Sequence, residues 1–240
     1  FQIDFMLKIA YDPIYAHPLP EGHRFPMLKY ELIPAQLLHE GTITPENLFS
    51  PEPLQEEILL LTHDENYWQQ LRDLTLPPKE QRRTGFPLSA RLVEREIRIA
   101  KGTINGCHFA LEHGIGFNVA GGTHHAFAGH GEGFCLLNDF AVAANYLLHH
   151  KRVRQALVID LDVHQGNGTA ALFASNDQVY TFSMHGAHNY PFQKEISDWD
   201  IPLPDGTDTA TYLQLLEAAL PQLVDRVKPD IVFYLSGVDI

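Results

Sequence analysis

The stretch 155–168 carries the side chains with the clearest chemistry, and it reads Gln-Ala-Leu-Val-Ile-Asp-Leu-Asp-Val-His-Gln-Gly-Asn-Gly. Its apolar run at 156–159 predicts a strand buried on both faces of a parallel sheet. Asp160, Asp162 and His164 follow at every second position, so the alternation of side chains along a strand puts them on one side. Ionised groups there must be paired or bound to a metal. A single Asp would ordinarily be a cap, but two carboxylates and an imidazole favour a metal site.

Two further loops carry polar side chains directly after expected strands. His124 and His125 follow two glycines and a threonine, and Ser183 and His185 lie at the end of a strand expected at 179–184. The loops that follow parallel strands lie at one edge of a sheet, so we expect all three polar groups to converge on one pocket. Histidines beside a metal supply the base and acid needed to activate water.

Three motifs together resemble the histone deacetylase superfamily: Gly-Gly-Thr-His-His-Ala at 121–126, Gly-Phe-Cys-x-x-Asn-Asp at 133–139, and Asp-Leu-Asp-Val-His-Gln-Gly-Asn-Gly at 160–168. Gln165, Asn167 and the proline-rich stretch 17–27 are most similar to class IV and bacterial members, whose relatives include acetoin utilisation proteins and acetylpolyamine amidohydrolases. The resemblance implies one catalytic domain over 1–240 with an α/β, arginase/deacetylase-like three-layer fold and a largely parallel central sheet.

The resemblance also implies roles for individual residues in a zinc-dependent amide hydrolase. Asp162 and His164 match two zinc ligands, and Fe²⁺ would suit the same donors. His125 matches the general base and His124 its acid/base companion. Asp160 matches the partner of His124, and Asn167 stands where the partner of His125 is expected. The implied reaction removes an acyl group, acetyl above all, from an acylated lysine of a protein or from a small acylated amine.

Binding roles follow from the same resemblance. Gly133, Phe134 and Tyr190 match the walls of a narrow acyl-lysine tunnel, and Arg24 matches an arginine beside the cavity that receives the released acid. A structural potassium site would use Asp160, Ser183 and Met184 with the main chain at 162 and 164, and a second monovalent site would use carbonyls near Phe173, Asn176 and Val179. Aromatic residues in such loops are also often core plugs, and Arg24 is equally explained as a surface cation.

The elements that must position these residues alternate between strands and helices, which indicates an α/β fold. We expect strands at 7–11, 57–62, 117–120, 156–159, 179–184 and, as a last buried strand, 231–235. We expect helices at 28–39, after Asp64, from Ser89 to 113, at 169–174 and at 209–227, and a further helix that the stretch 134–139 opens and that runs through 148. The stretch 76–87 is expected to be a surface loop.

Composition restricts the class of protein. The net charge of −13 and the absence of a Lys/Arg cluster argue against nucleic acid as a partner. Two cysteines are too few for a disulfide framework and indicate a reducing compartment, so we expect a cytoplasmic protein. No stretch has the length and apolarity of a membrane span. Oligomeric state is left open.

Two rival functions fit the same motifs: an acetylpolyamine amidohydrolase and a non-catalytic homologue that binds acyl-lysine. In the family, a third zinc ligand and a catalytic tyrosine come from later segments, beyond the position that matches Ile240. A catalytic zinc usually has three protein ligands. We therefore expect that the sequence lacks its C-terminal part and that this fragment alone is inactive.

Overall fold

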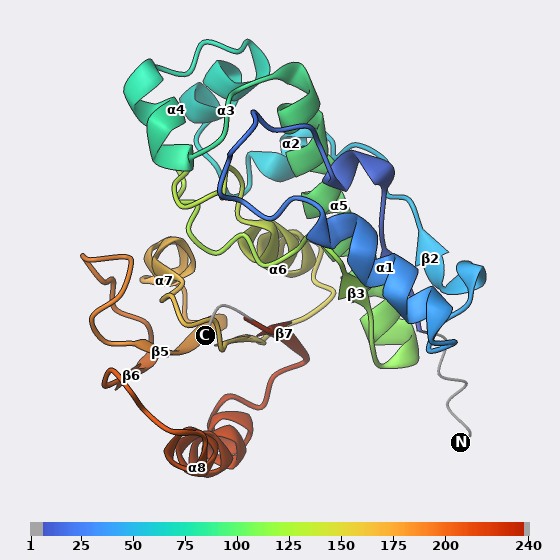
Figure 1. Cartoon of the computed structure of the whole chain (residues 1–240). Helices are drawn as coiled ribbons and strands as arrows, with labels where there is room; N and C mark the ends of the chain where they lie inside the picture. The colour runs from blue at the N-terminus through green and yellow to red at the C-terminus, as the bar shows by residue number, and fades with distance from the viewer. Residues whose placement is uncertain (1–6, 238–240) are drawn as a thin grey trace. The chain divides into compact units, whose positions relative to one another are not determined.

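The computed structural model describes residues 7–237 and divides the chain into two compact units, residues 1–146 and residues 147–240. Each unit holds a parallel sheet with flanking helices, which confirms the α/β class (Figure 1). The single catalytic domain expected from the sequence stays a prediction. None of the helices in the described residues is long and apolar enough to cross a membrane.

Three short parallel strands form the sheet of the first unit, in the order β2-β1-β3, with β1 at Ile9–Ala10, β2 at Leu48–Phe49 and β3 at Phe117–Asn118. The long helix α5 (Ala90–His113) packs against β1 and β3. As expected, α5 begins at Ser89, whose Oγ accepts a hydrogen bond from Leu92 N at 3.1 Å, and ends at Gly114 with φ of 92°. Gly102 allows this close packing, because a Cβ there would lie 2.9 Å from Ala10 Cβ.

The remaining helices of the first unit correct two expectations. The stretch 57–62 is not a strand, because α2 (Glu56–Leu59) forms one helical turn there. The two glutamates of that turn stabilise it, because negative charge near a helix N-terminus interacts favourably with the helix dipole. The stretch 76–87 is not only loop, because α4 (Pro78–Thr84) begins with a proline in its first turn and ends at Gly85 with φ of 80°. The expected helices α1 (Lys29–His39) and α3 (Glu65–Arg72) are confirmed.

Helix α6 (Asp139–His149) starts in the first unit, and its central residues Ala141, Val142, Ala143 and Ala144 are fully buried.

The two cysteines, Cys107 and Cys135, are buried and form no disulfide. Burial raises the pKa of the Cys107 thiol. The first unit thus encloses both thiols of the chain in its interior.

Four parallel strands form the sheet of the second unit, in the order β6-β5-β4-β7. They are β4 (Ala156–Asp160), β5 (Val179–Gly186), β6 (Trp199–Leu203) and β7 (Ile231–Leu235). Helices α7 (Asn167–Phe173) and α8 (Thr209–Val227) lie on opposite sides of these strands (Figure 1). Leu157 and Phe182 pack with Leu223 of α8 in the core of this unit.

The strands of the second unit confirm most expectations and correct two. All residues of β4 are buried, as its apolar sequence predicts. Strand β6 was not expected. Strand β7 is buried on one face only, since Val232 and Tyr234 are 45% and 56% exposed, so the expectation of a fully buried last strand is wrong.

Candidate active site

The two predicted catalytic histidines lie side by side in the first unit, in the loop that follows β3. His124 and His125 are 6% and 5% exposed, and their ring centroids are 4.1 Å apart with the planes inclined by 47°. Gly122, with φ of 85°, begins the turn into this pair, and His124 N donates to Gly122 O at 2.9 Å. The two rings therefore form one compact imidazole pair, and their predicted roles as general base and acid companion stay predictions.

A buried histidine that the sequence analysis did not single out supports the far end of this loop. His63 Nε2 accepts a hydrogen bond from Asn138 N at 3.0 Å, so Nδ1 carries the proton and donates to Phe127 O at 3.0 Å. Asn138 Nδ2 also donates to Ala126 O at 3.2 Å. His63 is thus a neutral link between the loop and the start of α6, and burial lowers its pKa to about 4.

His63 should make the stability of the first unit depend on pH. The unfolded chain binds a proton at this imidazole below its ordinary pKa near 6.5, whereas the folded chain does so only near 4. The unfolding free energy therefore falls as pH drops through this window, by about 2–3 kcal/mol between pH 7 and 4.5. Urea unfolding at both pH values should show that His63→Gln removes this part of the loss. Exposed His39→Gln is the control, and equal pH dependence in His63→Gln and the unmodified protein would contradict the prediction.

The predicted metal ligands lie in the second unit, beyond the end of β4. The strand ends at Asp160, so alternation along a strand, which we expected to align the three polar side chains, stops there. Two successive hydrogen bonds replace it: Asp162 N donates to Asp160 Oδ1 at 3.0 Å, and His164 N donates to Asp162 Oδ1 at 2.8 Å. Carboxylates that accept from the backbone two residues on form tight turns of this kind. These turns bring the side chains of Asp162 and His164 into contact.

Asp162 and His164 present one oxygen and one nitrogen to the same point. Asp162 Oδ1 lies 2.9 Å from His164 Nδ1, and the side chains are 13% and 28% exposed, so both are reachable from solvent. Carboxylate oxygen and imidazole nitrogen are common zinc ligands. The pair fits two positions of a zinc site. Within residues 7–237, no group of three or more His, Cys, Asp or Glu side chains is placed to hold a metal ion.

The other predicted residues of this edge are also in place, though their roles stay predictions. Asp160 on β4 pairs in register with Ser183 on β5, and both are buried. Ser183 Oγ hydrogen-bonds His185 Nδ1 at 2.9 Å, and burial lowers the pKa of His185. Asn167, 3% exposed, begins α7. The expected potassium ligands include Met184, Phe173, Asn176 and Val179, and nothing in the described residues tests them.

Tyr190 lies beside the predicted metal ligands. Its ring contacts that of His164 edge-on, with centroids 6.2 Å apart. The loop is fixed by Asn189 Nδ2, which donates to Val163 O at 2.7 Å, and by Lys194 Nζ, which donates to Asn189 O at 2.7 Å. Sequence analysis missed Lys194, since a lysine in a polar loop carries no signal of this contact. The position of Tyr190 is compatible with its predicted role in a substrate tunnel.

The remaining predicted substrate residues belong to an aromatic cluster in the first unit. Gly133 and Phe134 have positive φ angles, 56° and 66°, and turn the Phe134 ring onto Phe25 and Phe86 at 5.0 and 5.2 Å. Arg24 is exposed, with its guanidinium 5.0 Å above the Phe134 ring. Both the predicted roles and the plainer alternatives, a core plug and a surface cation, remain compatible with these contacts.

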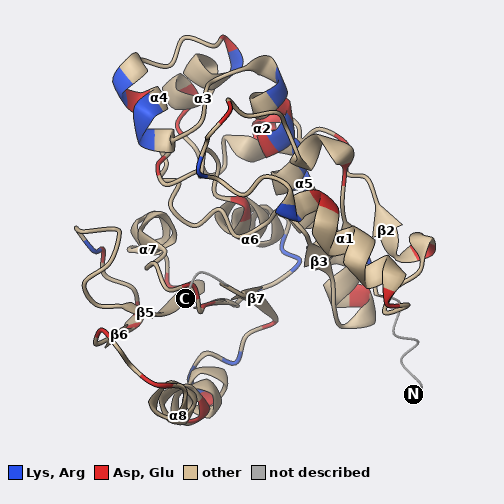
Figure 2. Cartoon of the chain, in the orientation of Figure 1, with Lys and Arg blue, Asp and Glu red and all other residues tan. Residues whose placement is uncertain are grey.

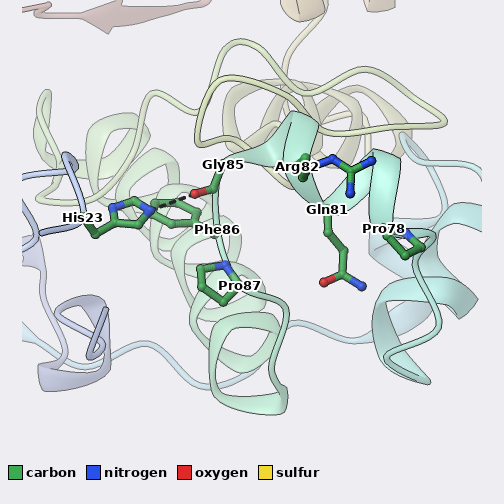
Figure 3. A pocket seen from close by; sticks show the side chains of 7 residues that line it. All are labelled: His23, Pro78, Gln81, Arg82, Gly85, Phe86 and Pro87. Atoms are coloured by element: carbon green, nitrogen blue, oxygen red, sulfur yellow. Dashed lines mark hydrogen bonds between the residues drawn. The ribbon is translucent and has the colours of Figure 1, made fainter. Parts of the chain in front are cut away.

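A pocket of about 460 Å³ adjoins this cluster. Figure 3 shows its lining, which consists of His23, Pro78, Gln81, Arg82, Gly85, Phe86 and Pro87. His23 Nδ1 accepts from Phe25 N, so the other ring nitrogen donates to Gly85 O at 2.8 Å. Helix α4 has Arg82 and Arg83 in its last turn, and Figure 2 colours its Lys and Arg positions blue; of these residues, Arg82 lines the pocket. Neither Phe134 nor Arg24 lines the pocket.

The predicted convergence of all three polar loops on one sheet edge needs correction. Strand β3, which precedes the histidine pair, belongs to a different sheet from β4 and β5. The same-edge argument therefore applies only to the loops after β4 and β5. The approach of His124 and His125 to Asp162 and His164 stays a prediction.

Comparisons with known proteins agree with the motifs. The histone deacetylase domain profile matches residues 23–240. An uncharacterized protein from Picosynechococcus is 47% identical over 96% of this chain and 77% of its own length. Histone deacetylase 2 from Arabidopsis thaliana is 28% identical over 91% of this chain, which spans 59% of that protein.

Solved structures point the same way. The crystal structure of an HDAC homolog from Aquifex aeolicus matches with a TM-score of 0.80 and 26% identity, over 95% of this chain and 67% of that one. The profile match covers far more than half of the sequence, and the structural match extends over both units. This chain belongs to the histone deacetylase family and has its arginase/deacetylase-like α/β fold.

Proposed function

We propose that the protein is a metal-dependent deacylase that hydrolyses the amide bond of an acylated lysine. The observation that carries this proposal is that a member of the family contains two close pairs of side chains. One is the buried imidazole pair His124–His125, with ring centroids 4.1 Å apart. The other is the predicted ligand pair Asp162–His164, with its oxygen and nitrogen donor atoms 2.9 Å apart. Amide hydrolysis by activated water needs both a Lewis acid and a positioned base.

The residues of this chain would divide the work as follows. Asp162 and His164 would hold Zn²⁺, which when bound supplies Lewis acidity that acidifies water and polarises the amide carbonyl. His125 takes the proton from the attacking water and later returns it to the leaving amine. His124, in ring contact with His125, supports this transfer electrostatically. Asp160 and Asn167 would orient the two imidazoles from their second nitrogens.

An acylated small amine is the second candidate substrate. The net charge of −13 would attract cationic polyamines, but it attracts lysine-rich protein segments equally. Charge therefore does not separate the two substrates.

A non-catalytic acyl-lysine binder is the third candidate. The potassium sites, a cytoplasmic location and the inactivity of the fragment stay predictions.

The test is an assay of the full-length gene product against three substrates: an acetyl-lysine peptide, a long-chain acyl-lysine peptide and acetylspermidine. We expect turnover of an acyl-lysine peptide that a chelator abolishes and added Zn²⁺ restores. Preference for acetylspermidine would favour the polyamine amidohydrolase. Binding of the peptide without turnover would favour the non-catalytic binder, and turnover unaffected by chelation would contradict the metallohydrolase.

A further inference from the structure

The carboxylate of Asp139 makes an unusual number of contacts for a residue with no assigned role. It is 1% exposed. Its Oδ1 accepts hydrogen bonds from Gly122 N at 2.9 Å, from Thr123 N at 2.8 Å and from Thr123 Oγ1 at 2.8 Å. Its Oδ2 accepts from Thr103 Oγ1 of α5 at 2.5 Å. Hydrogen bonds to a carboxylate are about twice as strong as neutral ones, so this group is a firm anchor.

The anchored backbone is the segment immediately before the histidine pair. Gly122 and Thr123 directly precede His124 and His125, and Thr123 Oγ1 also accepts from Asp139 N at 3.1 Å. Gly121 is required by the same approach, because a Cβ there would lie 2.8 Å from Asp139 Oδ2. The chain thus comes close enough to the carboxylate for successive backbone amides to reach it.

Asn138, the residue before Asp139, holds the segment that follows the histidine pair. Asn138 Nδ2 donates to Ala126 O at 3.2 Å, and His63 links Asn138 N to Phe127 O. The two imidazoles therefore lie between two attachment points that both lead to the first turn of α6. Asp139 contacts the residues before the pair and Asn138 the residues after it.

We propose that Asp139 is a positioning residue that holds the backbone at 122–123 and thereby the orientation of His124 and His125. The effect on catalysis rests on the proposed function, whereas the anchoring of the loop does not. Asp139 contacts neither histidine ring in any of the hydrogen bonds above, so it acts through the backbone. Small displacements of a catalytic group reduce turnover more than substrate binding.

The kinetic test compares Asp139→Ala with Asp139→Asn and Thr103→Val in the full-length protein. Asp139→Ala removes all four acceptor contacts, and we expect kcat to fall about 100-fold with KM changed less than about threefold. Asp139→Asn keeps one oxygen that accepts from residues 122–123 while its amide faces Thr103, so we expect partial rescue, with kcat about tenfold below normal. Thr103→Val removes one buried hydrogen bond of the same carboxylate on the helix side and should leave kcat nearly unchanged.

Hydrogen exchange of peptides covering 121–128 gives a readout that does not depend on activity. We expect the amides of Gly122 and Thr123 to exchange about tenfold or more faster in Asp139→Ala, and not in Thr103→Val. Ser89→Ala, which removes the cap of α5, controls for general destabilisation. If Asp139→Ala does not fold, Asp139→Asn against Thr103→Val decides by the same two readouts.

The outcomes separate this proposal from the proposed function. An unmodified protein without deacylase activity would overturn the proposed function, and exchange at 122–123 would still test the anchor. Normal kcat together with unchanged exchange at 122–123 in a folded Asp139→Ala protein would overturn the positioning role. Equal kinetic losses in Asp139→Asn, Thr103→Val and Ser89→Ala would do so as well, because they would reflect stability alone.

Discussion

Replacing His164 with alanine in the full-length protein is expected to lower kcat/KM at least about 1,000-fold, since metal stabilisation worth several kcal/mol is lost at about 1.36 kcal/mol per tenfold. Its Nδ1 lies 2.9 Å from Asp162 Oδ1, so the variant removes one of the two predicted metal ligands and leaves the carboxylate of the other. Bound zinc, measured by atomic emission after dialysis, should fall in parallel with activity.

His188→Ala is the matched control for this experiment. His188 belongs to the same unit, its side chain is 74% exposed, and it approaches only the exposed Asp205, at 3.3 Å, among its ion-pair contacts in the described residues. We expect normal zinc content and normal turnover in this variant. Full zinc content with full activity in His164→Ala would show that the zinc is held by other residues and would contradict the prediction.

His125→Ala is expected to reduce kcat by about 100- to 10,000-fold, the range typical of losing a general base. A histidine accepts a proton only when neutral, so activity of the unmodified protein should fall as pH drops through the pKa of the base. The variant should lose that acidic limb of the pH–rate profile and retain its zinc. Stopped assays over pH 5–9 with zinc analysis on the same samples provide the measurement.

His39→Ala serves as the control here, because His39 is an exposed histidine of the same unit at the end of α1. It should change neither kcat nor the shape of the profile. An unchanged acidic limb in the residual activity of His125→Ala would assign proton transfer to another group. His124 would then be the first alternative, given its ring contact with His125.

Much of the fold could be predicted where local signals were strong. The start and end of α5 could be predicted from Ser89 and Gly114, because a side-chain cap and a glycine in the left-handed conformation determine a helix end through residues close in sequence. The apolar run of β4 likewise matched a buried strand. The one-turn helix α2 and the proline-initiated α4 were missed, since so few residues show no helical periodicity. Strand β6 was missed because its sequence, Trp-Asp-Ile-Pro-Leu, includes an exposed proline.

The motifs singled out His124, His125, Asp162 and His164, and the roles of these residues stay predictions. Contacts that support them could not be predicted. The alternation argument failed at Asp162, where turn hydrogen bonds take over from the strand. The supporting roles of His63 and Asp139 depend on contacts between segments far apart in sequence, which no local pattern reveals.

The location of the two cysteines has a practical consequence. Both lie buried in residues 1–146, and residues 147–240 contain none. The thiolate is the form that attacks thiol reagents such as maleimides, and the raised pKa of Cys107 suppresses that form in the folded protein. The rate of maleimide labelling of this chain will therefore report how often the first unit opens. The second unit has no thiol to label, so its opening does not contribute to the signal.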